Sequence, residues 1–154
     1  MPVRSTYIGG VSTTAGAGAN AAGFPAYTVF ENVIDFSKLS TAAAQNDVVE
    51  ALKIPGGTFI QGVMWEVETV EGAARNFAIG DGDTANGYVT TTSANSQARG
   101  CSVLTLAEAA PPTFAFTAGK YYDADDTIDI LAVTSGGLTT AKIRVKAFGL
   151  VFGK

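Results

Sequence analysis

Short segments in which apolar and polar residues alternate recur along most of the chain. A two-residue period is typical of β-strands that bury one face and leave the other in solvent. The clearest example is the segment TFIQGVMWEVETV. One face of this segment is predicted to be core and carries Phe59, Val63, Trp65 and Val67. The opposite face carries Gly62, Glu66 and Glu68.

Comparable strand signals begin near Phe24 and follow at short intervals, separated by Gly, Pro, Asp and Asn. They include AYTVFENVIDF, DVVEALKI, RNFAIGDG, YVTTT, CSVLTLA, TFAFTAG and TIDILAVTS. The segment STAAAQN is compatible with either a single helical turn or a loop. With no convincing long helix, the pattern predicts an all-β fold. We expect a single-domain jelly roll, or another Greek-key β-sandwich, of about eight strands.

The closing segment AKIRVKAFGLVFGK keeps the strand period but changes the character of one face. Its core face is predicted to carry Ala141, Ile143, Val145 and Ala147. Its opposite face begins with the cations Lys142, Arg144 and Lys146. The same period then places three large apolar residues on that cationic face, namely Phe148, Leu150 and Phe152.

Each half of this closing face has more than one interpretation. The cationic stripe of Lys142, Arg144 and Lys146 can protect a sheet edge, match Glu66 and Glu68 on a neighbouring strand, or contact an acidic partner. The apolar residues Phe148, Leu150 and Phe152 can form a second core layer beneath a loop. Alternatively, they form an interface with another subunit or with a shell.

The chain has 154 residues, which suffices for one domain with a substantial core. Residues 1–24 form a tract rich in Gly, Ala, Ser and Thr, and we predict an irregular N-terminal arm there, followed by the β-sandwich domain over residues 25–154. The arm is either a flexible terminus or a segment that becomes ordered on a partner.

The composition of the chain argues against several classes of function. The net charge of -4 argues against a general nucleic-acid binder. No apolar run is long enough to span a bilayer, and the N-terminus lacks the apolar core of a secretory signal, so we expect neither membrane association nor export. The chain has no histidine and only Cys101, which excludes Ser-His-Asp and Cys-His devices and histidine-ligated zinc. We therefore predict no catalytic residues, no metal, no cofactor and no enzymatic activity.

Two acidic segments nevertheless merit comparison with calcium sites. Asp81 and Asp83 imitate the start of an EF-hand loop, but Ala85, Asn86 and Thr92 occupy positions where that loop needs a ligand, glycine and glutamate. Because the match fails, a hairpin turn that uses Asp and Asn for its backbone angles is the preferred interpretation. The second segment is a solvated turn or a cation site, with Asp129 expected on the wet face of the next strand, and it carries Asp123, Asp125 and Asp126.

Three stretches of the chain resemble one group of proteins. They are VIDFSKLSTAAAQNDVVEALKIPGGTFIQGVMWEVETVEG, FAIGDGDTANGYV and GKYYDADDTIDILAV, within about residues 32–133. In order and turn chemistry they resemble small virion structural proteins of tailed bacteriophages. Their shared motifs are structural turns, with no catalytic signature.

The resemblance implies a capsid decoration or cement protein, or a related head or fibre component. It implies a jelly-roll or similar β-domain, association as a homo-oligomer with a trimer favoured, binding to the major capsid protein, and no enzymatic activity. It further implies a position on the virion surface after assembly in the host cytoplasm. The alternative is a carbohydrate- or receptor-binding domain of a phage fibre, in which the acidic turns and Tyr88, Tyr121 and Tyr122 form a sugar site.

Overall fold

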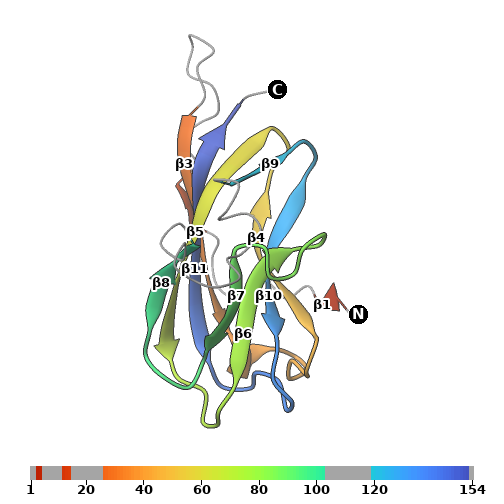
Figure 1. Ribbon diagram of the computed structural model, residues 1–154, viewed down its shortest axis with the longest axis vertical. Coiled ribbons are helices and arrows are strands. Elements are labelled where there is room, and N and C mark those ends of the chain that lie inside the picture. The colour runs from red at the N-terminus through yellow and green to blue at the C-terminus, as the bar shows by residue number, and fades with distance from the viewer. Residues whose placement is uncertain (1–2, 5–11, 15–25, 103–118, 153–154) are drawn as a thin grey trace.

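A computed structural model describes residues 3–4, 12–14, 26–102 and 119–152 of the chain. In these residues two β-sheets face each other, and one short 3-10 helix, η1 (Phe36–Lys38), follows the first long strand (Figure 1). Sheet A contains, in spatial order, β1 (Val3–Arg4), β4 (Val48–Ile54), β10 (Asp126–Ala132), β6 (Asn76–Asp81) and β7 (Val89–Ser93). Sheet B contains β2 (Ser12–Thr14), β3 (Ala26–Asp35), β11 (Lys142–Val151), β5 (Thr58–Thr69), β8 (Arg99–Cys101) and β9 (Lys120–Tyr122).

The chain crosses from one sheet to the other at nearly every connection from β3 to β11. The exceptions are β6 and β7, which both lie in sheet A, and β8 and β9, which both lie in sheet B. The resulting orders, β4-β10-β6-β7 and β3-β11-β5 followed by β8 and β9, are those of an eight-stranded jelly roll. β8 and β9 together fill the eighth position, because each pairs with a different part of β5. The predicted β-sandwich is thus confirmed.

Two short strands from the N-terminal region extend the two sheets. β1 pairs in parallel with β4, and β2 pairs antiparallel with β3. Both add to strands that would otherwise be sheet edges, where unpaired backbone groups favour unwanted association. Most of the predicted strands CSVLTLA and TFAFTAG lies outside the described residues, since β8 ends at Cys101 and β9 begins at Lys120.

The core lies between the two sheets and is built from the inward rows of their long strands. β11 contributes Ile143, Val145 and Ala147, all fully buried. The indole of Trp65 on β5 meets the ring of Phe77 on β6 edge to face, with centroids 5.6 Å apart. The predicted inward orientation of Trp65, Val63 and Val67 therefore holds.

The predicted orientation of Phe59 is wrong, because β5 contains one extra residue. In the pairing with β11, Gly62 lies opposite Phe148, but the next paired residue of β5 is Ile60, opposite Gly149. This bulge at Gln61 exchanges the two faces of the strand. Ile60 is fully buried, whereas Phe59 lies on the outer face opposite Leu150. The close approach requires Gly149, since an added Cβ would lie 1.9 Å from the carbonyl oxygen of Phe59.

A second bulge, in β4, is stabilised across the core. The register between β10 and β4 shifts between Ile128 and Asp129, which leaves Ala51 as the extra residue. The buried side-chain amide of Asn32 on β3 donates to the carbonyl oxygen of Ala51 at 2.9 Å. This hydrogen bond satisfies two buried polar groups and links the two sheets.

One buried carboxylate fixes the connection that leads into the closing strand. Glu71 is 5% exposed and accepts hydrogen bonds from the backbone N–H groups of Thr139, Thr140 and Ala141. The hydroxyl groups of both threonines donate to it as well. Burial alone would raise the pKa of Glu71, but these hydrogen bonds outweigh it and lower the pKa to about 2.

We predict that Glu71→Gln lowers the free energy of unfolding by about 2 kcal/mol at neutral pH, because an amide N–H₂ then faces backbone donors. The folded-state pKa lies below the ordinary 4.5, so the stabilisation is present above pH 4.5 and is lost as the pH falls towards 2. Urea unfolding from pH 7 to pH 2.5 should show the difference between the variant and the wild type shrinking. Glu66→Gln, at an exposed glutamate of β5, is the control. A difference that is independent of pH would contradict this assignment.

Candidate interaction surface

The outer face of sheet B changes from charged to apolar along its three central strands. The alternation of β11 continues without a break, so Phe148 and Leu150 share a face with Lys142, Arg144 and Lys146. Val29 lies beside Phe148 and Tyr27 beside Leu150 on β3, while Gly62 and Phe59 flank them on β5. We call these two rows the apolar end of the face, and the rows from Lys142 to Lys146 the charged end.

The charged end is an ion-pair ladder across β3, β11 and β5. Arg144 lies at its centre and forms ion pairs with Glu31 on β3 and Glu68 on β5. Lys146 Nζ lies 3.2 Å from Glu31, and Lys142 Nζ lies 3.5 Å from Glu68. The hydrogen bond from Arg144 lowers the pKa of Glu31. The cations of β11 are therefore largely neutralised within the chain.

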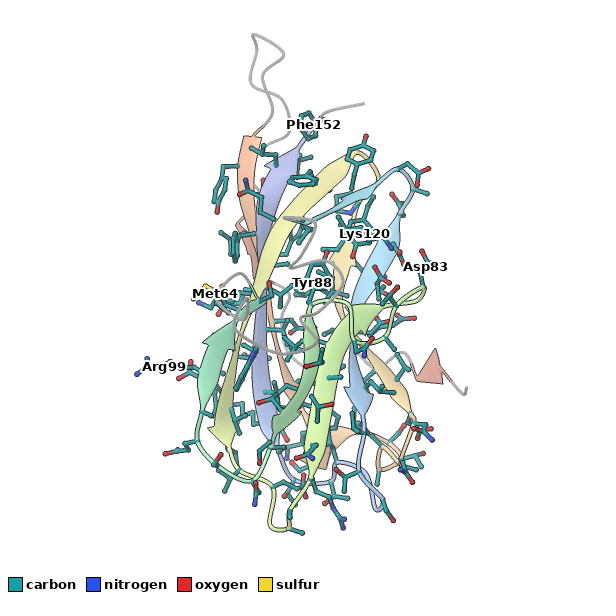
Figure 2. The ribbon with its side chains drawn as sticks, in the orientation of Figure 1. Met64, Asp83, Tyr88, Arg99, Lys120 and Phe152 are labelled. Atoms are coloured by element: carbon teal, nitrogen blue, oxygen red, sulfur yellow. The ribbon has the colours of Figure 1, made fainter. Side chains whose placement is uncertain are left out.

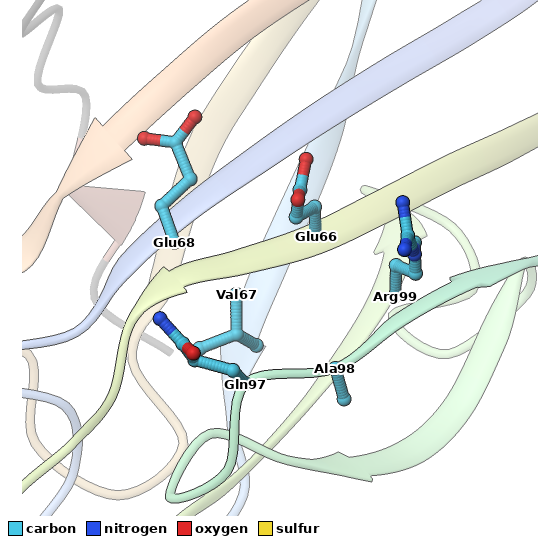
Figure 3. A pocket seen from close by; sticks show the side chains of 6 residues that line it. All are labelled: Glu66, Val67, Glu68, Gln97, Ala98 and Arg99. Carbon is cyan, nitrogen blue, oxygen red and sulfur yellow. The ribbon is translucent and has the colours of Figure 1, made fainter.

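Of the two glutamates expected opposite the cationic stripe, Glu68 takes part in the ladder directly. Glu66 lies opposite Arg144 on one side and opposite Arg99 on the other. It lines a shallow hollow of about 480 Å³ together with Glu68, Val67, Gln97, Ala98 and Arg99 (Figure 3). Both Glu66 and Arg99 are exposed, and no ion pair joins them in the described part of the chain.

The apolar end carries large side chains that are partly open to solvent. Tyr27 is 58% exposed and Val29 is 38% exposed, whereas Phe148 and Leu150 are half-buried between their neighbours. Phe152 follows β11, is 40% exposed, and meets the ring of Tyr121 with centroids 6.2 Å apart. Sequence reasoning found the residues of β11 but missed Tyr27 and Val29, whose position beside β11 follows only from the strand pairing.

Met64 marks the border between the two ends, opposite Lys146. It is 47% exposed and projects from the same side of the molecule as Arg99 (Figure 2). Two hollows meet at Met64 and Lys146. The first, of about 370 Å³, is otherwise lined by Tyr27, Val29 and Phe148. The second, of about 440 Å³, extends towards β8 and includes Trp65, Glu66, Arg99, Gly100, Cys101 and Arg144. We call these two hollows together the Met64 groove.

The first acidic segment places a lysine where a cation would lie. Lys120 Nζ is 2.6 Å from the carboxylate of Asp81 and 3.1 Å from that of Asp83 (Figure 2). The other oxygen of Asp81 accepts the backbone N–H groups of Asp83 and Thr84. Burial would lower the pKa of Lys120, but its hydrogen bonds to the two aspartates raise it overall. Lys120 thus supplies within the chain the positive charge that a metal ion would bring.

The second acidic segment is held by backbone contacts. Asp125 accepts the N–H of Gly56 at 2.8 Å, and Asp126 accepts the N–H of Thr127. Asp123 is exposed on the same turn. In the residues that the structure describes, no group of three or more His, Cys, Asp or Glu side chains is arranged to hold a metal ion.

The three tyrosines of the sugar-site alternative do not share a surface. The hydroxyl groups of Tyr88 and Tyr122 lie 3.0 Å apart in the interior, and that of Tyr122 donates to Asp81. Burial raises the pKa of both tyrosines. Only Tyr121 of the three is exposed, at 53%. An aromatic platform for a sugar is therefore not formed by these residues.

Asp129 departs from the sequence expectation in its burial. It lies on the outer side of β10 as predicted, opposite Glu50 on β4 and Gly80 on β6, yet it is only 4% exposed. Its Oδ1 atom has no hydrogen-bond partner. Burial raises the pKa of Asp129 to about 6; a hydrogen bond with Thr127 lowers it, and the charges of Glu50, Asp126 and Asp81 raise it further.

The described residues contain no helix long and apolar enough to cross a membrane. No protein-family model and no curated protein matches the sequence.

Comparison with solved structures finds the same fold in bacteriophage capsids. A chain in the capsid of Ralstonia phage GP4 superposes with a TM-score of 0.64 and 11% identity, over 99% of this chain and 100% of that one. A chain in the acidic stable capsid of Helicobacter pylori bacteriophage KHP30 gives 0.57 and 13%, covering 84% and 91%. A chain in the capsid asymmetric unit of cyanophage Pam1 gives 0.55 and 15%, covering 88% and 91%. The structural neighbours are thus phage capsid chains, in agreement with the resemblance of the sequence motifs to phage virion proteins.

We predict that Lys120→Met destabilises the fold by about 3 kcal/mol, because it leaves the buried carboxylate of Asp81 without its counter-ion. Thermal unfolding of Lys120→Met, Asp81→Asn and the double variant tests this. The double variant should be more stable than the sum of the two single losses implies. Lys38→Met, at an exposed lysine of η1, is the control. Additive losses would show that the two groups act independently.

Asp129→Asn is expected to stabilise the protein by about 2 kcal/mol at pH 7.5, because folding then no longer buries a charge beside Glu50. The folded-state pKa of about 6 lies above the ordinary 3.8, so the wild type gains stability as the pH falls from 6 towards 4. Chemical unfolding at pH 7.5 and pH 4 should show the advantage of the variant disappearing at the lower pH. An equal loss of stability at both values would instead assign Asp129 a purely hydrogen-bonding role.

Proposed function

We propose that this protein is a non-enzymatic structural component of a bacteriophage virion, and specifically a capsid decoration or cement protein. The observation that carries the proposal is the apolar end of sheet B, presented on a jelly roll whose structural neighbours are capsid chains. Among the described residues, the buried acids Asp81 and Glu71 are engaged by Lys120 and by backbone groups, and Asp129 has Thr127 and Glu50 as neighbours, so we assign none of them a catalytic role.

The proposed contact surface centres on Phe148 and Leu150, with Phe152 beyond the end of β11. A patch of partly exposed aromatic and aliphatic side chains beside a self-neutralised charged region is typical of a surface that meets another protein. The charged end, with Lys142, Arg144 and Lys146 paired to glutamates, surrounds this patch on one side as a polar rim. We propose that the patch joins copies of the chain, with a trimer favoured, and that the assembly binds the major capsid protein at the capsid surface after assembly in the host cytoplasm.

The fibre-domain alternative has less support. A carbohydrate site would need Tyr88, Tyr121 and Tyr122 at one surface, and two of these residues are buried. The carboxylates of Asp81 and Asp83, which would hold calcium beside the sugar, are instead paired with Lys120.

We predict that wild-type protein self-associates at micromolar concentration and that Phe148→Asp weakens this association at least about tenfold, because a carboxylate replaces an apolar contact. Multi-angle light scattering over a concentration series measures the effect. Thr91→Asp, at an exposed position of β7 in sheet A, is the matched control and should associate normally. A wild type that remains monomeric, unchanged by Phe148→Asp, would contradict the self-association.

The virion role has its own test. Binding of purified protein to phage heads that lack it, followed by mass spectrometry of the washed particles, should give the stoichiometry of a lattice site. Absence of saturable binding to such heads would contradict the role even if the protein self-associates.

A further inference from the structure

The Met64 groove combines an apolar floor with cations at its edge. Its floor includes Val29, Met64 and Phe148, and Lys146 lies where its two hollows meet. Arg144 also contributes to the wall, but its guanidinium is engaged by Glu31 and Glu68. Such a groove suits an aromatic side chain accompanied by carboxylates.

Arg99 is the cation of the groove that the ladder does not use. It lies on β8, at the outer edge of sheet B, and its side chain is exposed. No ion pair engages it among the described residues, whereas Lys142, Arg144 and Lys146 each contact a glutamate. Arg99 is thus positioned to receive a carboxylate from outside the chain.

The same molecule presents a segment of the complementary chemistry. β9 carries Tyr121, which is 53% exposed, and the turn that follows it carries the exposed carboxylates of Asp123 and Asp125. We call this segment the acidic turn. Its backbone is held in place, since Asp125 accepts the N–H of Gly56 and the carbonyl oxygen of Asp123 lies where a Cβ on Gly56 would be only 2.9 Å away.

Asp123 and Arg99 of one chain cannot meet. β9 pairs with the first residues of β5, with Tyr122 opposite Thr58, whereas Arg99 on β8 lies opposite Glu66. Eight residues of extended strand separate these positions by about 26 Å. Because the turn that carries Asp123 is fixed to Gly56, a contact between Asp123 and Arg99 has to join two copies.

We propose that the acidic turn of one copy docks into the Met64 groove of the next copy. Tyr121 packs against Met64 and Phe148, and the carboxylate of Asp123 pairs with Arg99. Each copy then gives its acidic turn to one neighbour and its groove to another, a head-to-tail contact that closes into a ring when the rotation between copies divides a full turn. The inference deepens the self-association part of the proposed function and rests on it.

Charge reversal with rescue provides the test, using light scattering and sedimentation velocity on the full-length protein. Arg99→Asp and Asp123→Arg should each weaken self-association at least about tenfold, because each places like charges together. The double variant restores an opposite pair at every head-to-tail contact and should return to within about threefold of the wild type. Lys38→Glu, an exposed reversal just after β3 and away from both surfaces, should have no effect. Circular dichroism melting checks that all variants are folded.

The outcomes separate this inference from the broader function. Single reversals that leave the oligomer unchanged, or a double variant no better than either single one, would overturn the docking while leaving self-association intact. A reversal of Arg99 that abolishes binding to phage heads but not self-association would also overturn it, because the groove would then hold the shell protein. Rescue by the double variant, observed in the absence of phage heads, supports it whether or not the virion role is established.

Discussion

The position of β11 between two partners is the constraint on which the outer surface of this protein depends. β11 pairs with β3 and with β5 along its whole length, and its own alternation is unbroken. The extra residues are absorbed by β5, at Gln61 and at Glu68. Because the pairing of β11 with β3 contains no register shift, the side chains of β11 keep their faces from Lys142 to Val151. The apolar residues that follow Lys146 are therefore directed outward by the same pairing that buries Ile143 and Val145.

Neighbouring groups within the chain compensate several of its buried or crowded charges. Glu71 is saturated by backbone donors, Asp81 is neutralised by Lys120, and the cations of β11 are shared between Glu31 and Glu68. Paired groups of this kind offer little net attraction to a partner, because their charges are already compensated. What remains distinctive on the surface of sheet B is its apolar end, together with the exposed guanidinium of Arg99. Arg99 and residues of the apolar end line the Met64 groove.

The sequence pattern predicted the class of fold and the orientation of β11, because both follow from a two-residue period that the chain keeps. The orientation of Phe59 could not be predicted, since a single-residue bulge leaves no mark in composition. Lys120 and Asp81 are 39 positions apart and lie on strands of opposite sheets, β9 and β6, so only the packing of the two sheets brings them together. The exposure of Tyr27 and Val29 could have been predicted from the sequence, because β3 carries apolar residues on both of its faces. That signal indicates an outer face with apolar character, but the pairing with β11 is needed to locate it.

The edge of sheet B beyond β5 is divided between two strands, and this division has a consequence for how the fold can vary. β8 is anchored near Val63, where Ser102 accepts a backbone N–H, and β9 is anchored at Ile60. The two strands pair with separate residues of β5, namely Met64 to Glu66 for β8 and Thr58 to Ile60 for β9. The register of one strand therefore does not fix the register of the other, and the two halves of this edge can change separately while β5 keeps its pairing with β11.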